Sequence, residues 1–419
     1  MAVKKGSRLV FALLLVSSLL LLLSAFGVLQ KPVRGAKRFQ LDAGESLRPS
    51  ESAKVPADET GQETDPPLET DLPEETKPDI SDLDLVALPV TGNDPDQLTP
   101  GGESLRLWPA QPAIPVLHHP DLTVYYGQAA ASAPLRGITV ILDASRGGAD
   151  TGAVWGSGSE AVMEKTLTLA IATEAEKALT NLGAQVIMTR TTDEEFSLFR
   201  TVAKAADIAL IRYGDAAVAA GYERDLVDNL RLLMSDIIRI NQNSPASGGR
   251  GLFGSIGTPP QLRLLYDIEG QYPDTLFINI ALGNDAADST ASGCQAYYMS
   301  ADYTAEVNNG YAVGQDAQSL APNYTDIDSQ GRRRLAMLLK SALSGIEPFL
   351  APEDGTHEGQ EKDMAVLRLT NYVSASFVPG YLSNDGDRRV LTSEAGREAI
   401  GKAVANAVLQ YYVTARPSE

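Results

Sequence analysis

Cysteine and histidine are almost absent from this sequence. Its 419 residues include one cysteine, Cys294, and three histidines. A single cysteine excludes an internal disulfide framework and a cysteine-based zinc site within the chain. The scarcity of histidine also leaves few ligands for any other transition-metal site. The histidines are His118, His119 and His357.

Basic residues are also few relative to acidic residues. The chain has 35 Lys and Arg against 54 Asp and Glu, which gives a formal net charge of −19. This net charge argues against nucleic acid as a partner, because binding to phosphates needs a basic face. With 43% hydrophobic and 21% charged residues, the composition is that of a globular protein with a substantial core.

The longest hydrophobic run lies at the N-terminus. Lys4, Lys5 and Arg8 precede 21 uncharged residues from Leu9 to Leu29. A helix of this length reaches about 30 Å, the thickness of a hydrocarbon core. Residues 1–30 are thus predicted to form an uncleaved signal anchor, a transmembrane helix. The alternative is a signal peptide whose cleavage releases a secreted protein.

Residues 31–134 are predicted to be a disordered linker. Between Asp42 and Arg106 there are seventeen acidic and only four basic residues, with many prolines. Such a stretch cannot bury enough apolar surface to offset the entropy of ordering it. A passive spacer is the favoured interpretation, and a polyanionic segment that binds a partner is the alternative.

Residues 135–419 are predicted to fold as an α/β domain with a mainly parallel, twisted sheet flanked by helices. Ile138–Leu142 is an unbroken apolar run, typical of a strand buried inside a parallel sheet. A helical pattern over about 163–182 and a strand at 185–189 complete a strand–helix–strand unit. Further strands are expected at 276–281, 294–299 and 375–378, and further helices at 196–206, 332–344 and after Ser393. An insertion of about 208–274 separates the second and third strands and contains a helical pattern over 226–240.

The phrase ITVILDASRGGADTGAV, at 138–154, resembles the zinc-dependent N-acetylmuramoyl-L-alanine amidases of bacterial cell walls. In that family a strand ends in D-P-G-H-G-G, followed by D-x-G-A. Residues that match the family's other motifs follow in the same order along the chain. They are Asp143, Gly147-Gly148, Asp150, Gly152-Ala153, Glu164, Thr189-Arg190, Asp193, Arg200, Phe277–Ile280, Leu367-Arg368, Thr370-Asn371 and Gly380–Asn384. The resemblance implies an amidase/exopeptidase-like α/β fold and a site that hydrolyses peptidoglycan.

The family's catalytic site is degenerate in this sequence. The family holds zinc with two histidines and a glutamate, and a second glutamate acts as general base. The resemblance places the histidines at Arg146 and Ala281, the glutamate ligand at Glu164 and the general base at Val378. Only Glu164 keeps the family's residue type, so we expect no zinc, no other cofactor and no catalytic residue here.

Substitute ligands are few. His357 lies in a polar loop that could approach the site, whereas His118 and His119 are expected to be solvated linker residues. Asp285 and Asp288 follow the lost second histidine and could form an oxygen-rich magnesium or calcium site. A solvated acidic face is the favoured interpretation of these two residues.

Arg146 could replace the charge of the lost metal. A guanidinium cannot ligate zinc, but it can form an ion pair with a carboxylate that would otherwise be buried alone. We therefore expect Arg146 to pair with Glu164. The alternative is that Arg146 points into solvent.

Three functions fit the sequence. The favoured one is a membrane-anchored, extracytoplasmic, non-catalytic amidase-like protein that binds peptidoglycan or a wall-associated protein. Basic residues flank the apolar run on both sides, so only the resemblance to wall enzymes places the domain outside the membrane. The alternatives are an active N-acetylmuramoyl-L-alanine amidase with a rearranged site, and a structural or assembly protein.

Overall fold

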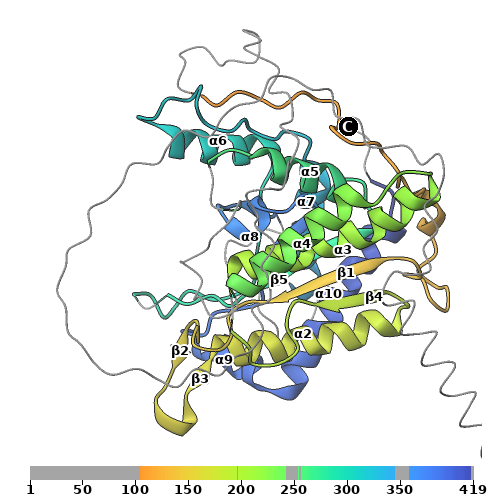
Figure 1. Ribbon diagram of the computed structural model, residues 1–419. Helices are drawn as coiled ribbons and strands as arrows, with labels where there is room; N and C mark the ends of the chain where they lie inside the picture. The colour runs from red at the N-terminus through yellow and green to blue at the C-terminus, as the bar shows by residue number, and fades with distance from the viewer. Residues whose placement is uncertain are drawn as a thin grey trace, which may run out of the picture.

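The computed structural model describes residues 104–195, 197–241, 253, 256–285, 287–344 and 358–416 (Figure 1). The predicted signal anchor, residues 31–103 of the predicted linker and His357 lie outside these residues. Within the described part, no helix is both long enough and apolar enough to cross a bilayer.

A six-stranded sheet forms the centre of the domain. Four neighbouring strands run parallel, β6 pairs antiparallel with β8, and β7 is parallel to β6. In spatial order the strands are β4 (Gln185–Met188), β1 (Thr139–Ala144), β5 (Thr275–Ile280), β8 (Val373–Val378), β6 (Gln295–Tyr298) and β7 (Gln360–Glu361). The predicted mainly parallel sheet is therefore confirmed.

Strand β1 lies inside this sheet, between β4 and β5. All six of its residues are buried. Val140 and Leu142 face one hydrophobic cluster, whereas Ile141 faces another. A strand buried on both faces needs no polar side, which explains the unbroken apolar run.

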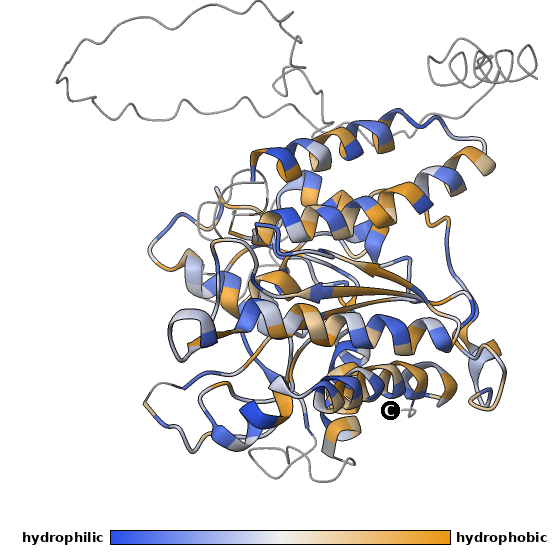
Figure 2. Cartoon of the chain, turned by 90° about the horizontal axis from the view of Figure 1, so that it is seen from below, coloured by the Kyte–Doolittle hydropathy of each residue, from blue (hydrophilic) through white to orange (hydrophobic). Residues whose placement is uncertain are grey.

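Helices cover both faces of the sheet (Figure 1). One face packs against α2 (Glu164–Asn181), α7 (Ser329–Ser344) and α10 (Glu394–Val413). The other packs against α3 (Leu198–Ala219), α4 (Asp225–Ile240), α5 (Pro260–Glu269) and α8 (Ala365–Arg368). Figure 2 shows mostly hydrophobic strands between helices of mixed hydropathy, as expected for helices with one buried face.

Short elements complete the described chain. The hairpin strands β2 (Val154–Trp155) and β3 (Val162–Met163) precede α2, and 3₁₀ helices lie at η3 (Leu122–Tyr125) and η4 (Gly158–Glu160). Helix α6 (Ala301–Ala312) follows β6, and α9 (Asp385–Thr392) follows β8.

The packed region begins before the predicted boundary at residue 135. Leu105, Trp108 and Ile114, which were assigned to the linker, are buried. The Trp108 indole donates a hydrogen bond to the carbonyl of Thr258 at 2.9 Å. Residues 104–134 therefore pack on the domain. Isolated apolar residues between prolines form no periodic pattern, so this packing could not be predicted from the sequence.

The described residues of the predicted insertion, 208–241, 253 and 256–274, are part of the folded core. Helix α3 continues through residue 208 to Ala219, well past the predicted helix end at 206. Helix α4 packs against it, and Tyr213, Leu230 and Met234 are fully buried. The insertion thus adds helices to one face of the sheet.

Candidate functional site

Three of the four positions that the resemblance assigns to the site lie at the carboxyl ends of neighbouring strands, and the fourth begins a helix. Arg146 follows β1, Ala281 follows β5 and Val378 ends β8, while Glu164 is the first residue of α2. Because β1, β5 and β8 are adjacent and parallel, their carboxyl ends meet at one edge of the sheet. This edge is where open α/β sheets bind ligands.

Glu164 connects these elements. Its carboxylate accepts a hydrogen bond from the backbone N–H of Ala153 at 3.0 Å and another from Leu282 at 3.2 Å. Leu282 directly follows Ala281, whose own N–H donates to the carbonyl of Phe377 in β8 at 3.0 Å. Glu164 is only 3% exposed, so its carboxylate is held in a fixed, buried position.

Arg146 forms the expected ion pair with Glu164. Its Nε lies 3.4 Å from Oε2 of Glu164, and its Nη1 lies 3.2 Å from Oδ2 of Asp150. Partial burial opposes the charge of Arg146, but these two carboxylates outweigh that effect and raise its pKa above the ordinary value. The arginine is thus held as a cation beside Glu164.

The loop after β1 permits this pairing through its backbone. Arg146 has a φ of 71°, and no other described non-glycine residue has a positive φ. Gly152, with a φ of 63°, lies so close to the pair that an added Cβ would clash with the Glu164 carboxylate and with Cγ of Arg146. A glycine is required there both for the conformation and for the space.

Charged residues from neighbouring elements hold the loop in place. Lys165 donates to the carbonyl of Gly148 at 2.7 Å and forms an ion pair with Asp193 at 2.6 Å. Arg190 donates to the carbonyls of Ala144 and Lys165. The sequence singled out Arg190 and Asp193 but missed Lys165, whose only signal is its place next to Glu164.

A buried polar network lies beneath the site. Asp143 is fully buried and accepts hydrogen bonds from Thr189 and Asn279, each at 2.7 Å. Ser376 donates to Asn279 at 2.7 Å, which extends the network from β1 to β8. Burial raises the pKa of Asp143, although its hydrogen bonds oppose the shift. This network fixes the relative positions of the strand ends.

The residues at this edge do not fit a zinc ion. Catalytic zinc needs three protein ligands that carry free lone pairs. Glu164 offers a carboxylate, but Ala281 and Val378 offer only hydrocarbon, and Arg146 brings a positive charge next to that carboxylate. Among the described residues, no group of three or more His, Cys, Asp or Glu side chains could hold a metal ion.

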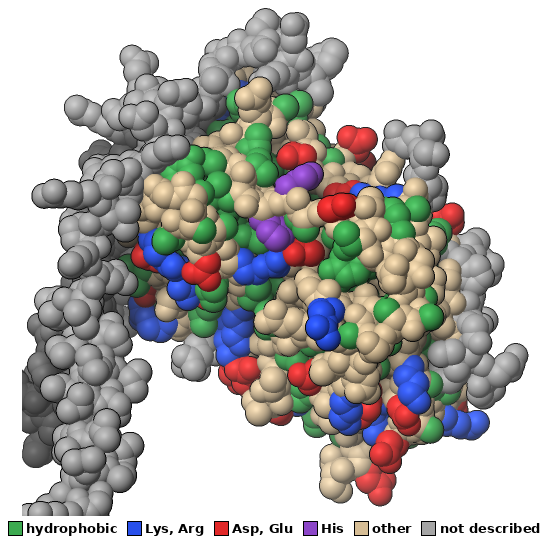
Figure 3. All heavy atoms as spheres, turned by 90° about the vertical axis from the view of Figure 1, so that its right-hand side faces the viewer, with side chains coloured by type: hydrophobic (Ala, Val, Ile, Leu, Met, Phe, Trp, Pro, Cys, Tyr) green, Lys and Arg blue, Asp and Glu red, His purple; other side chains and the backbone are tan. Residues whose placement is uncertain are grey.

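The substitute ligands that the structure describes do not complete the site. Asp285 and Asp288 use their carboxylates to cap local turns, by accepting from the N–H groups of Ala287 and Thr290 respectively. His119 is exposed. Figure 3 shows the two described histidines close together, bordered by acidic and basic side chains.

The prediction that His118 is a solvated linker residue is wrong. Its Nε2 lies 2.9 Å from Asp274, and its ring stacks on Tyr272 with the centroids 4.5 Å apart. Asp274 immediately precedes β5, so His118 packs at the amino ends of the strands, away from Glu164.

Comparisons with known proteins identify the family of this chain. Residues 140–212 and 266–410 match the model of the N-acetylmuramoyl-L-alanine amidase family, slightly more than half of the chain. The gap of 213–265 lies inside the predicted insertion and is shorter than it. An 80-residue segment is 41% identical to the probable cell wall amidase LytH from two strains of Staphylococcus epidermidis, and it covers 19% of this chain but only 27% of each relative.

Solved amidase structures also match, at low similarity. The CwlD amidase of Clostridioides difficile, solved in complex with the GerS lipoprotein, is 20% identical over 65% of this chain and 98% of its own, with a TM-score of 0.36. AmiC2 of Nostoc punctiforme is 17% identical over 66% and 97% of the two chains, with a TM-score of 0.36. By the family match, this chain belongs to the N-acetylmuramoyl-L-alanine amidase family.

Proposed function

We propose that this protein is a membrane-anchored, extracytoplasmic member of the amidase family that binds the peptidoglycan wall or a wall-associated protein without hydrolysing it. The observation that carries the proposal is the ion pair between Arg146 and Glu164, 3.4 Å apart at the carboxyl edge of the sheet. The pair occupies positions at which active relatives are expected to hold zinc.

The missing chemistry supports a binding role. Amide hydrolysis by a zinc enzyme needs a metal that lowers the pKa of a water molecule and a base that accepts its proton. Arg146 stays protonated and accepts no proton. Val378, at the position of the family's general base, has a hydrocarbon side chain that is 6% exposed. Glu164 is already engaged by two backbone N–H groups and Arg146.

An exposed aromatic residue beside the site offers a surface for binding. Trp155 lies two residues after Ala153, whose N–H bonds Glu164, and its side chain is 46% exposed. The guanidinium of Arg388 lies 3.8 Å from the centroid of its ring. An exposed indole can stack against the apolar face of a sugar ring or against a peptide.

Co-sedimentation with purified peptidoglycan tests this proposal. The full-length protein should sediment with the wall and release no peptide from it, and Trp155→Ala should weaken the binding. Tyr311→Ala is a matched control, because Tyr311 is an exposed aromatic on α6, 53% exposed. Released peptide would instead support an active amidase. Failure to sediment would favour a structural or assembly role.

A further inference from the structure

A second candidate site lies at the opposite edge of the sheet. A pocket of about 160 Å³ opens where the chain enters β5 and β8. Gly270 and Pro273 precede β5, and Val373 is the first residue of β8. The pocket is therefore at the amino ends of the strands whose carboxyl ends adjoin Arg146 and Glu164, and it is separate from the family site.

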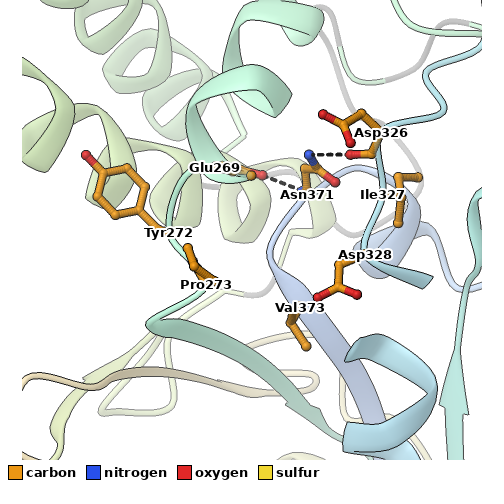
Figure 4. Close-up of a pocket in the computed structure, with 9 residues that line it drawn as sticks. Glu269, Tyr272, Pro273, Asp326, Ile327, Asp328, Asn371 and Val373 are labelled. Atoms are coloured by element: carbon orange, nitrogen blue, oxygen red, sulfur yellow. Dashed lines mark hydrogen bonds between the residues drawn. The ribbon is translucent and has the colours of Figure 1, made fainter. Parts of the chain in front are cut away.

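Asn371 has an unused acceptor in this pocket. Its Nδ2 donates to the carbonyls of Tyr266 at 3.0 Å and Asp326 at 3.1 Å, so the amide cannot flip without losing both bonds. Its Oδ1 is buried without a hydrogen-bond partner among the described residues, and the whole residue is 5% exposed. Figure 4 shows Asn371 among the lining residues, with the hydrogen bond from its amide to the backbone of Asp326. A buried acceptor of this kind needs a hydrogen-bond donor, which a ligand or a water molecule in the pocket can supply.

The charges around the pocket favour a cation. Asp326 and Asp328 line it beside Glu269, a buried carboxyl whose pKa burial raises to about 7, and no lysine or arginine lines it. Asp328 is neutralised by Arg416, with 3.1 Å between Oδ1 and Nη1. In contrast, Asp326 is exposed, and its carboxylate has no hydrogen-bond partner in the described part of the chain. A ligand with both positive charge and N–H donors would satisfy Asn371 and Asp326 together.

The apolar walls distinguish an organic cation from a metal ion. Pro273, Ile327 and Val373 line the pocket beside the polar groups. Hydrocarbon walls contribute nothing to a hydrated metal ion, but they can cover the methylene groups of an alkyl chain. We propose that this pocket binds a primary alkylammonium group, the group carried by a lysine side chain, with its nitrogen at Asn371 and Asp326.

Gly270 provides the room for this arrangement. A Cβ at this position would lie 2.8 Å from Nδ2 of Asn371 and would displace the amide. Its φ of −62° is available to any residue, so Gly270→Ala should alter the position of Asn371 without straining the backbone. The variant therefore tests the geometry of the pocket separately from its charge.

The test is a titration with n-butylammonium chloride, which carries the lysine side-chain group alone. Full-length protein labelled with ¹⁵N at asparagine is studied in detergent micelles, and the Asn371 amide signal is identified by its loss in Asn371→Gln. The signal should shift saturably with n-butylammonium but not with neutral 1-butanol. Asp326→Asn should weaken the affinity about three- to fivefold, and Gly270→Ala should also weaken it.

Asp302→Asn is the matched control, because Asp302 is an exposed carboxylate on α6 and should leave the affinity unchanged. A second titration uses Nα-acetyl-lysine N-methylamide. Binding of this probe assigns the pocket to lysine in a peptide, whereas binding of n-butylammonium alone assigns it to free alkylamines. An absent or non-saturable shift, an equal response to 1-butanol, or an unchanged affinity in Asp326→Asn would overturn the proposal.

Discussion

Arg146 combines a left-handed backbone conformation with two ionic contacts. A non-glycine residue with positive φ costs about 1–2 kcal/mol, so the surrounding contacts must hold Arg146 in this conformation. The contacts to Glu164 and Asp150 do so in the structure. Glu164 is buried while the side chain of Arg146 is 42% exposed, so removal of the arginine leaves a poorly solvated carboxylate.

The coupling between Arg146 and Glu164 can be measured with a double-mutant cycle. Residue 146 is alanine in both the single and the double variant, so any change in its backbone energy cancels in the cycle. We expect a coupling free energy of about 1–2 kcal/mol, between the values for exposed and buried pairs. Denaturant melts of the wild type, Arg146→Ala, Glu164→Gln and the double variant give this value. Additive effects would show that the pair is not coupled.

Glu269 should make the stability of the domain depend on pH. Burial raises its pKa from 4.5 to about 7, although hydrogen bonds from Asn371 and Thr370 oppose the shift. The folded state therefore holds this proton more tightly than the unfolded state does. The resulting stabilisation is fully present below pH 4.5 and is lost as the pH rises through 7.

Glu269→Gln isolates this effect, because glutamine resembles the protonated acid. Buried Asp143 and Asp267 also have raised pKa values and contribute in the same direction, so the comparison between variant and wild type is needed. Denaturant melts at pH 5 and pH 7.5 should show a loss of stability that is smaller in Glu269→Gln by up to about 3 kcal/mol. An equal loss in both proteins would contradict the raised pKa of Glu269.

At the scale of elements, the sequence predicted the regular core well. The run 138–142 predicted an interior strand because burial on both faces removes every polar position, and β1 is that strand. The apolar spacing over 163–182 predicted α2 to within a residue at each end. Both patterns are local in sequence, because α2 buries one face against the sheet and β1 is buried on both faces.

Contacts between segments far apart in sequence were not predictable in this way. The bond from Trp108 to Thr258 joins residues 150 positions apart and leaves no local pattern. The position of His118 beside Asp274 has the same cause. The pairing of Arg146 with Glu164 could be predicted because the family resemblance supplied the distant contact.

Trp108 should anchor residues 104–134 to the domain. Trp108→Ala removes a side chain that is 4% exposed, along with its indole hydrogen bond. We expect a loss of about 3–5 kcal/mol in the free energy of unfolding. Leu107→Ala is the neighbouring control, since Leu107 is 36% exposed and should cost much less. Similar losses in the two variants would argue that this segment does not anchor through Trp108.

For the whole molecule, the site edge and the amino-end pocket lie at opposite ends of the same strands. At the site edge Gly152 and Glu164 are in close contact, and the resemblance assigns the family's other site positions to Arg146, Ala281 and Val378. If only those positions prevent metal binding, then Arg146→His, Ala281→His and Val378→Glu introduced together should restore zinc binding. Activity should lag behind binding, because residues around the ligands also tune a metal site. A folded triple variant without zinc affinity would show that the family's site positions are wrongly assigned to residues 146, 281 and 378.

The most direct test of the central claim is the zinc content of the wild-type, full-length protein. The protein is incubated with zinc, freed of unbound metal by gel filtration and analysed by elemental mass spectrometry, with the triple variant measured in parallel. The ion pair between Arg146 and Glu164 predicts a zinc content far below one equivalent per chain in the wild type. A full equivalent of zinc that is lost on Glu164→Gln would contradict the account, because it would place a working metal site at the edge we describe as non-catalytic.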